Sequence, residues 1–132
     1  MKFPVVVLLA ACLSSTSAVA DVVSDLLKQY EKQGAQQFTA GKAESMWTQP
    51  FAGAKSGEKR RCSTCHSEDL RRTGKHAVTG KAIEPLAPSA NPKRLTDPEH
   101  IEKWFSRNCK WTLGRECTPQ EKGDFLVMIR SK

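Results

Sequence analysis

The sequence predicts a small all-α domain, and two observations support this prediction. Apolar residues recur at helical spacing in several segments, whereas no segment alternates between apolar and polar residues over the length of a strand. The chain has 132 residues, a length that allows one ordinary domain. Its hydrophobic fraction of 39% is too high for an intrinsically disordered chain.

Residues 1–20 have the pattern of a secretory signal peptide. Lys2 supplies a positive charge, residues 5–11 form an apolar run, and Ala18-Val19-Ala20 matches the small-x-small site of signal peptidase. We therefore expect cleavage after Ala20, a mature domain over residues 21–132 and a periplasmic location. No membrane span is expected, because a spanning helix needs about 20 apolar residues and this run is shorter.

A lipoprotein is the alternative for this segment, because Cys12 follows Leu9-Ala10-Ala11 in the manner of a lipoprotein cleavage box. Ordinary cleavage removes Cys12 and leaves an even set of cysteines. An even number suits an exported protein, in which disulfides persist. The remaining cysteines are Cys62, Cys65, Cys109 and Cys117.

Two helices are expected in the N-terminal part of the mature chain. Residues 21–33 carry apolar side chains at helical spacing, and Gly34 follows as a stop signal. A second helix is expected over about residues 36–47, before Pro50. Residues 50–61 are then interpreted as a loop, because glycines and a run of basic residues follow the proline.

Two more helices are expected near the C-terminus. Thr96 and Glu99 fit a capping box that opens a helix ending near Asn108, with an apolar face of Ile101, Trp104 and Phe105. Thr118 and Glu121 fit a second capping box, opening a helix through Ile129. The segment before them, residues 73–98, has little periodicity and is interpreted as a long loop. Four short helices make a thin core, which usually needs a staple, a metal or a cofactor.

The segment Cys62-Ser63-Thr64-Cys65-His66 matches C-x-x-C-H, the attachment signature of c-type haem. On a helical turn, cysteines three residues apart share a face, where they can bond the two vinyl groups of one porphyrin. His66 can then bring an imidazole nitrogen to the iron. We therefore predict one covalent haem c held by these three side chains. A dithiol redox motif normally accompanies a βαβ fold, and a four-thiolate zinc site suits an exported protein poorly.

The ligand opposite His66 decides the function. A methionine thioether there gives a six-coordinate electron carrier of raised potential, but no Met lies in the long loop after His66. Met46 and Met128 lie in predicted helices, where core packing is the better interpretation. The residues themselves leave several candidates open, together with no ligand at all: His76, Asn91, His100 and Asn108.

From Cys62 onward the chain resembles the SHP-type cytochromes c, the sphaeroides haem protein-like members of class I. This resemblance implies a class I cytochrome c-like fold, in which short helices wrap around one covalently bound haem. Residues 21–61 resemble the family only loosely. The matching segments are CSTCH (62–66), TGK (79–81), PLAPSANP (85–92), TD (96–97), EKWFSRNC (102–109), GREC (114–117) and TPQEKGD (118–124).

The resemblance also implies the arrangement of the site. His66 and Asn108 would bind opposite faces of the haem iron, with a Cys109–Cys117 disulfide beside Asn108. In this family the Asn leaves on reduction, and the open ferrous iron binds oxygen, nitric oxide or carbon monoxide. Ligand chemistry agrees, because a hard, neutral amide oxygen suits ferric iron better than ferrous iron.

Three functions follow from this interpretation. The first is a gas-binding cytochrome that exchanges electrons with a partner and that has, as a further alternative, oxygen or nitrogen-oxide reductase activity. The second is an ordinary six-coordinate electron carrier, and the third is a gas or redox sensor without turnover. Family resemblance implies a multihaem or membrane-bound cytochrome as the partner. The formal net charge of +7 suits an acidic docking surface on that partner, and in an exported monomer it does not indicate nucleic acid.

Two smaller assignments concern the surroundings of the haem. His66 is expected to donate its second ring N–H to a carbonyl of the segment 85–88, which would fix the tautomer and the ring angle. Basic side chains are expected to neutralise the haem propionates, with a solvated basic surface as the alternative. These are Arg71, Arg72, Lys75 and Lys81.

Overall fold

The computed structural model describes residues 21–54 and 57–132. The predicted signal peptide over residues 1–20, with the alternative lipidation site at Cys12, lies outside the described residues. Within the described part of the chain, no helix combines the length and the apolar character that crossing a bilayer requires.

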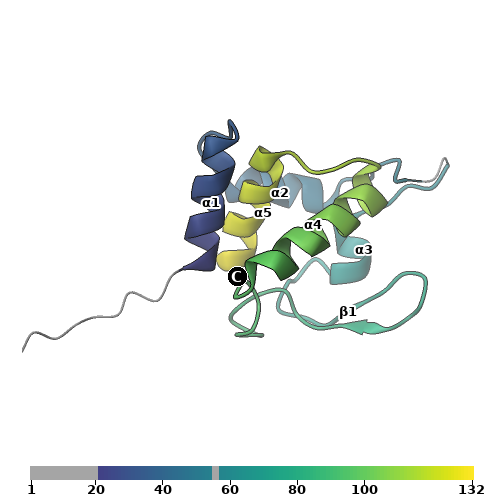
Figure 1. Ribbon diagram of the computed structural model, residues 1–132. Helices are drawn as coiled ribbons and strands as arrows, with labels where there is room; N and C mark the ends of the chain where they lie inside the picture. The colour runs from purple at the N-terminus through teal and green to yellow at the C-terminus, as the bar shows by residue number, and fades with distance from the viewer. Residues whose placement is uncertain (1–20, 55–56) are drawn as a thin grey trace, which may run out of the picture.

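Helices dominate the described residues, which confirms the predicted all-α class. Two very short strands are the exception, and they lie below the long helix α4 in the view of Figure 1. The elements are α1 (Val22–Lys32), α2 (Ala40–Thr48), α3 (Cys62–His66), β1 (Gly74–Lys75), β2 (Ala82–Ile83), α4 (Pro98–Leu113) and α5 (Pro119–Arg130).

The first and last helices lie where the sequence predicts them. The Asp21 side chain caps α1 by accepting a hydrogen bond from the backbone N–H of Val23 at 3.2 Å, and Gly34 follows with a φ of +98°. The capping box of α5 is confirmed. The Thr118 hydroxyl accepts from the Glu121 N–H at 3.2 Å, and the Glu121 carboxylate accepts from the Thr118 N–H at 2.9 Å.

The middle helices differ from their predicted bounds. α2 begins at Ala40 rather than near residue 36. The capping box predicted for α4 is wrong, because Asp97 is the cap and accepts from the His100 N–H at 3.1 Å. α4 also continues past Asn108 to Leu113, since no helix breaker occurs before Gly114, where φ is +76°.

The long segment predicted as a loop contains a small hairpin that the sequence did not indicate. β1 and β2 pair antiparallel, with Gly74 opposite Ile83 and Lys75 opposite Ala82. Two residues per strand are too few to show an alternating pattern. A further antiparallel bridge joins Phe51 to Arg60 in the other predicted loop.

The core forms where α1 and α2 both pack against α5, as Figure 1 shows. One cluster of buried residues includes Trp47 and Met128, and a second includes Tyr30 and Leu126. Of the apolar face predicted for α4, Ile101 is buried and Phe105 packs against the core, while Trp104, 41% exposed, lines the cavity described below.

A polar contact ties α1 to α4 and α5. The buried Tyr30 hydroxyl donates to the Glu102 carboxylate, which also accepts from Lys122 Nζ at 2.6 Å. Burial, together with the adjacent carboxylate, raises the pKa of Tyr30 well above its usual range. The phenol is therefore neutral and remains a hydrogen-bond donor.

Gly74 brings the hairpin against the turn that carries the predicted haem-attachment motif. A Cβ atom at this position would lie 2.0 Å from the carbonyl oxygen of Cys65, and the nearest atoms are all backbone atoms of Cys65 and His66. No side chain larger than hydrogen fits without displacing one of the two backbones. The glycine therefore sets the distance between β1 and α3.

We predict that Gly74→Ala lowers the free energy of unfolding by about 1–3 kcal/mol, the usual cost of overpacking a closed contact. Gly41→Ala is the matched control, because nothing lies within 4 Å of a Cβ at that helical position. The control should be neutral or up to about 1 kcal/mol more stable, through its better helix propensity. Urea unfolding of the purified protein, followed by far-UV circular dichroism, measures both. Parental stability of Gly74→Ala would refute the close contact.

Candidate haem site

Two adjoining cavities lie between the haem-motif turn and α4. Their volumes are about 610 Å³ and 450 Å³. The larger is lined mainly by apolar and aromatic residues, a lining typical of cofactor pockets. Six residues line both cavities, three from α3 and three from the C-terminal half of α4: Cys62, Cys65, His66, Asn108, Trp111 and Thr112.

The motif forms a single helical turn, α3, as its spacing predicts. Cys62 and Cys65 are half-buried free thiols, and both line the cavities. Burial raises the pKa of the Cys62 thiol to about 11, so it stays protonated at neutral pH. These two side chains are the free cysteines of the described residues, since the others form a disulfide.

His66 is half-buried beside Trp47, and its Nδ1 atom is buried. Their ring centres lie 5.8 Å apart, and the indole N–H of Trp47 donates to the carbonyl of Ser67 at 2.8 Å. Burial, and secondarily the charge of Arg94, lowers the pKa of His66 to about 4. The imidazole is therefore neutral at pH 7, which is the form that binds metals. The sequence did not reveal the role of Trp47 in holding this turn.

The carbonyl predicted to orient His66 has a different partner. Nδ1 of His66 is buried and has no hydrogen-bond partner in the described part of the chain, so that prediction is wrong. Arg94 donates instead to the Pro85 carbonyl and to the Glu84 carbonyl, at 2.8 Å each. An arginine fork satisfies two carbonyls at once, which explains why it occupies this position.

The cavities separate the candidates for the opposite ligand. Asn108 lines both, and His76 and His100 line the larger one. Met128 is a buried core residue and Met46 packs against the same core cluster. Asn91 donates to the Glu84 carboxylate at 3.2 Å. Among the described residues, neither methionine nor Asn91 belongs to a cavity wall.

The basic side chains at the cavities also differ from those predicted. Arg71 pairs with Asp69 at 3.0 Å, and Arg72, Lys75 and Lys81 do not belong to the described lining of either cavity. Five other Lys or Arg residues do line the two cavities: Lys59, Arg60, Arg61, Arg94 and Arg107.

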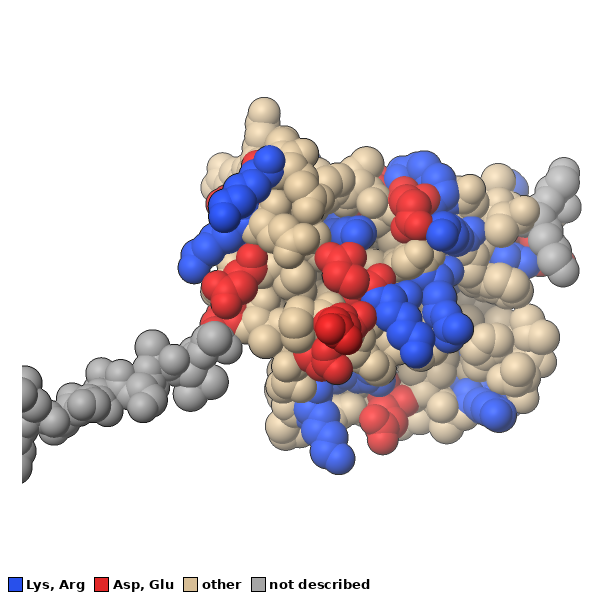
Figure 2. Space-filling view, viewed as in Figure 1, with Lys and Arg blue, Asp and Glu red and all other residues tan. Residues whose placement is uncertain are grey.

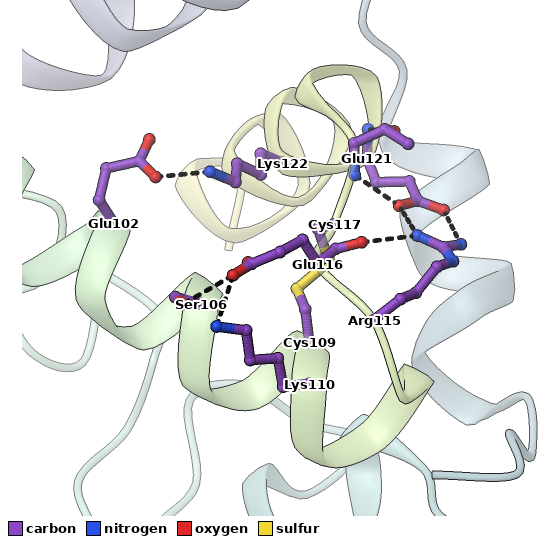
Figure 3. The surroundings of a disulfide bond; sticks show 10 residues. Glu102, Ser106, Cys109, Lys110, Arg115, Glu116, Cys117, Glu121 and Lys122 are labelled. Atoms are coloured by element: carbon purple, nitrogen blue, oxygen red, sulfur yellow. Dashed lines mark hydrogen bonds and ion pairs between the residues drawn. A yellow bond between two sulfur atoms is a disulfide. The ribbon is translucent and has the colours of Figure 1, made fainter. Parts of the chain in front are cut away.

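A disulfide adjoins Asn108. Cys109 in α4 is bonded to Cys117, with Cα atoms 5.5 Å apart, and both residues are buried. Figure 3 shows how polar contacts flank it. Glu116 accepts from Lys110 at 2.8 Å and from Ser106 at 3.0 Å, so it is bonded to the same helix turns. The disulfide and these contacts fasten the segment 114–117 to the turn that carries Asn108.

The residues present fit a covalent haem. Two unpaired thiols on one helical face, a neutral imidazole with a buried, unpartnered nitrogen and a large, mostly apolar cavity lie together. Across the cavity, Asn108 offers an amide. Two thiols and an imidazole are the groups that attach a c-type haem and bind its iron.

Comparisons with known proteins relate the chain to c-type cytochromes. A family model described as a domain of unknown function, DUF1924, matches residues 33–129. Cytochrome c-type protein SHP of Cereibacter sphaeroides is 36% identical over 126 residues, covering 95% of this chain and 96% of that protein. Cytochrome c'' of Methylophilus methylotrophus is 42% identical over 74 residues, covering 56% of this chain and 51% of that protein.

Solved structures show the same fold. Oxidised SHP, described as an oxygen-binding cytochrome c, superposes with a TM-score of 0.76 and 38% identity, covering 83% of this chain and 96% of that chain. Oxidised cytochrome c'' superposes with a TM-score of 0.72 and 29% identity, covering 84% and 94% of the two chains. The fold is thus that of small c-type cytochromes, and the cofactor is one covalent haem c. The chain belongs to the DUF1924 family and is an SHP-type cytochrome c.

Proposed function

We propose that this protein is an exported monohaem cytochrome that binds a diatomic gas when reduced and exchanges electrons with a partner cytochrome. The observation that carries the proposal is the shared cavity wall, where Asn108 of α4 faces the same space as Cys62, Cys65 and His66. The relative SHP, an oxygen-binding cytochrome c, supports the gas-binding part. The haem supplies an iron atom with one position available to a small gas.

Each side chain of the site has a distinct role in this proposal. Cys62 and Cys65 bond the porphyrin through thioethers, and His66 binds the iron through its neutral imidazole. Asn108 would be the second ligand of the ferric iron through its amide oxygen and would be released on reduction, because a hard neutral donor binds ferrous iron weakly. The displaced amide remains nearby, where its NH₂ group can donate a hydrogen bond to the gas.

The partner is proposed to be a multihaem or membrane-bound cytochrome with acidic groups around its docking face. Residues 59–81 carry seven Lys or Arg and only two Asp or Glu, so most of the net positive charge lies in and around the haem motif. Elsewhere, cations and carboxylates are interspersed on the face seen in Figure 2. A localised positive charge near the redox centre steers an acidic partner toward it.

Three alternatives make different predictions from the same residues: an electron carrier, a sensor and a reductase. An ordinary electron carrier would keep both ligands in both redox states. A sensor would bind gas without turnover, whereas a reductase would consume oxygen or nitric oxide steadily when supplied with electrons. An oxygen electrode, with the protein and an excess of electron donor, separates the last two.

The first test is the visible spectrum of the purified holoprotein. After reduction by dithionite we expect a high-spin ferrous haem, because Asn108 has left, and a shift of the Soret band when carbon monoxide is added. Sharp, split low-spin bands that carbon monoxide does not change would contradict gas binding and favour the electron carrier.

The second test is Asn108→Ala. Losing the amide should convert the ferric haem from six-coordinate to high-spin, while the reduced protein still binds carbon monoxide. Asn91→Ala is the control, because Asn91 contacts Glu84 and is not among the described residues that line the two cavities. A ferric spectrum of Asn108→Ala that equals the parental one would exclude Asn108 as the ligand.

The third test concerns export. Expression of the full chain in a Gram-negative host should yield periplasmic protein that begins at Asp21, because the small-x-small site precedes it. Intact-mass measurement of the purified protein gives this N-terminus directly. A lipidated Cys12 in the membrane fraction would instead establish the lipoprotein alternative.

A further inference from the structure

One arginine of the basic run before the haem motif is buried. Arg60 is 8% exposed, while Lys59 and Arg61 on either side are exposed. The cause is the bridge with Phe51, whose backbone hydrogen bonds are 2.8 Å in both directions. In extended backbone, successive side chains point to opposite sides, so Arg60 alone points inward.

The Arg60 guanidinium binds the end of α4. Its central carbon lies 3.4 Å from the ring centre of Trp111, and Nη1 donates to the Trp111 carbonyl at 2.9 Å. Nη2 pairs with Glu58 at 2.5 Å. The Trp111 carbonyl belongs to the last turn of α4, where helix carbonyls have no partner within the helix. One side chain therefore stacks on this residue and also satisfies its backbone.

Two glycines let the backbones meet at this contact. A Cβ at Gly53 would lie 3.1 Å from Arg60 Cδ, and a Cβ at Gly114 would lie 2.7 Å from the Gly53 carbonyl oxygen. Both glycines have positive φ values, of +69° and +76°. The segment that leads into the haem motif is therefore packed directly on the C-terminal turn of α4.

This contact acts on the helix face that carries Asn108. Asn108 and Trp111 are three residues apart in α4, so they share a face, and both line both cavities. The disulfide holds the adjacent residue, Cys109, from the other direction. The turn between them is thus fixed on two sides.

We infer that Arg60 is a positioning residue for the distal ligand. By stacking on Trp111 and donating to its carbonyl, Arg60 ties the haem-attachment segment to α4 and holds the Asn108 amide where it can rebind oxidised iron. The inference rests on the proposed role of Asn108. Because the amide oxygen is a weak iron ligand, small displacements of the turn that carries Asn108 strongly change its affinity for the iron. Because the turn is held in place, the Asn108 side chain can leave on reduction and return to the same place on oxidation.

The test is Arg60→Met, which keeps the length and apolar stem of the side chain but removes the stacking and the hydrogen bonds. We expect the binding of Asn108 to ferric iron to weaken by roughly tenfold, the lower end of the loss seen when an outer partner of a metal ligand is removed. The readouts are the high-spin fraction in the ferric absorption and electron paramagnetic resonance spectra. Hydrogen exchange of the amides of residues 108–114 should also become faster.

Three further variants make the outcome decisive. Arg60→Lys keeps the charge but not the planar fork, so it should resemble Arg60→Met; parental behaviour would overturn the geometric role in favour of charge alone. Arg130→Met, which breaks an exposed pair with Asp21, should leave the ferric spectrum unchanged. In an Asn108→Ala background, Arg60→Met should have no further spectral effect.

These outcomes separate the inference from the proposed function. If Asn108→Ala alone leaves the ferric spectrum unchanged, the proposed ligand is wrong, whatever Arg60 does. If Asn108→Ala changes it but Arg60→Met lowers only stability, Arg60 is a purely structural residue and the inference is overturned.

Discussion

The site depends on how the short helix α3 and the long helix α4 lie on either side of the same cavities. α3 supplies two thiols and an imidazole, and α4 supplies an amide, so a chain with a thin core has its candidate chemistry at the wall of a large cavity. Small domains with so little buried surface commonly rely on a cofactor for cohesion. Here a haem bound in the mainly apolar cavity between these helices would supply that cohesion.

The proposed chemistry needs a ligand that is weak but well placed. Strong donors such as a thioether or a second imidazole would hold the iron in both oxidation states, and such a protein would only carry electrons. An amide ligand can dissociate from the iron. Because the bond between amide and iron is weak, the protein fold has to hold the amide in position. The disulfide at Cys109, the contacts of Glu116 and the buried Arg60 all converge on one stretch of α4.

The sequence predicted much of this and missed identifiable parts. The α1 and α5 boundaries and the haem-motif turn followed from periodicity, a capping box and a spacing rule, all of which are local. The continuation of α4 past Asn108 has a local cause, since no helix breaker occurs before Gly114, and the predicted end lay too early. Arg94 and Arg60 had no such local signal. Each binds backbone carbonyls, those of Glu84 and Pro85 for Arg94 and that of Trp111 for Arg60, and no motif marks such a contact.

The placement of the aromatic side chains has a practical consequence. All three tryptophans of the chain, Trp47, Trp104 and Trp111, line the larger cavity. Porphyrins absorb where indoles emit and quench them efficiently at such short range, so the intact cytochrome should be nearly dark in fluorescence. Any event that separates porphyrin from indole, such as local opening of the fold, therefore increases the tryptophan fluorescence. Tryptophan fluorescence therefore reports whether the interior of the protein is closed.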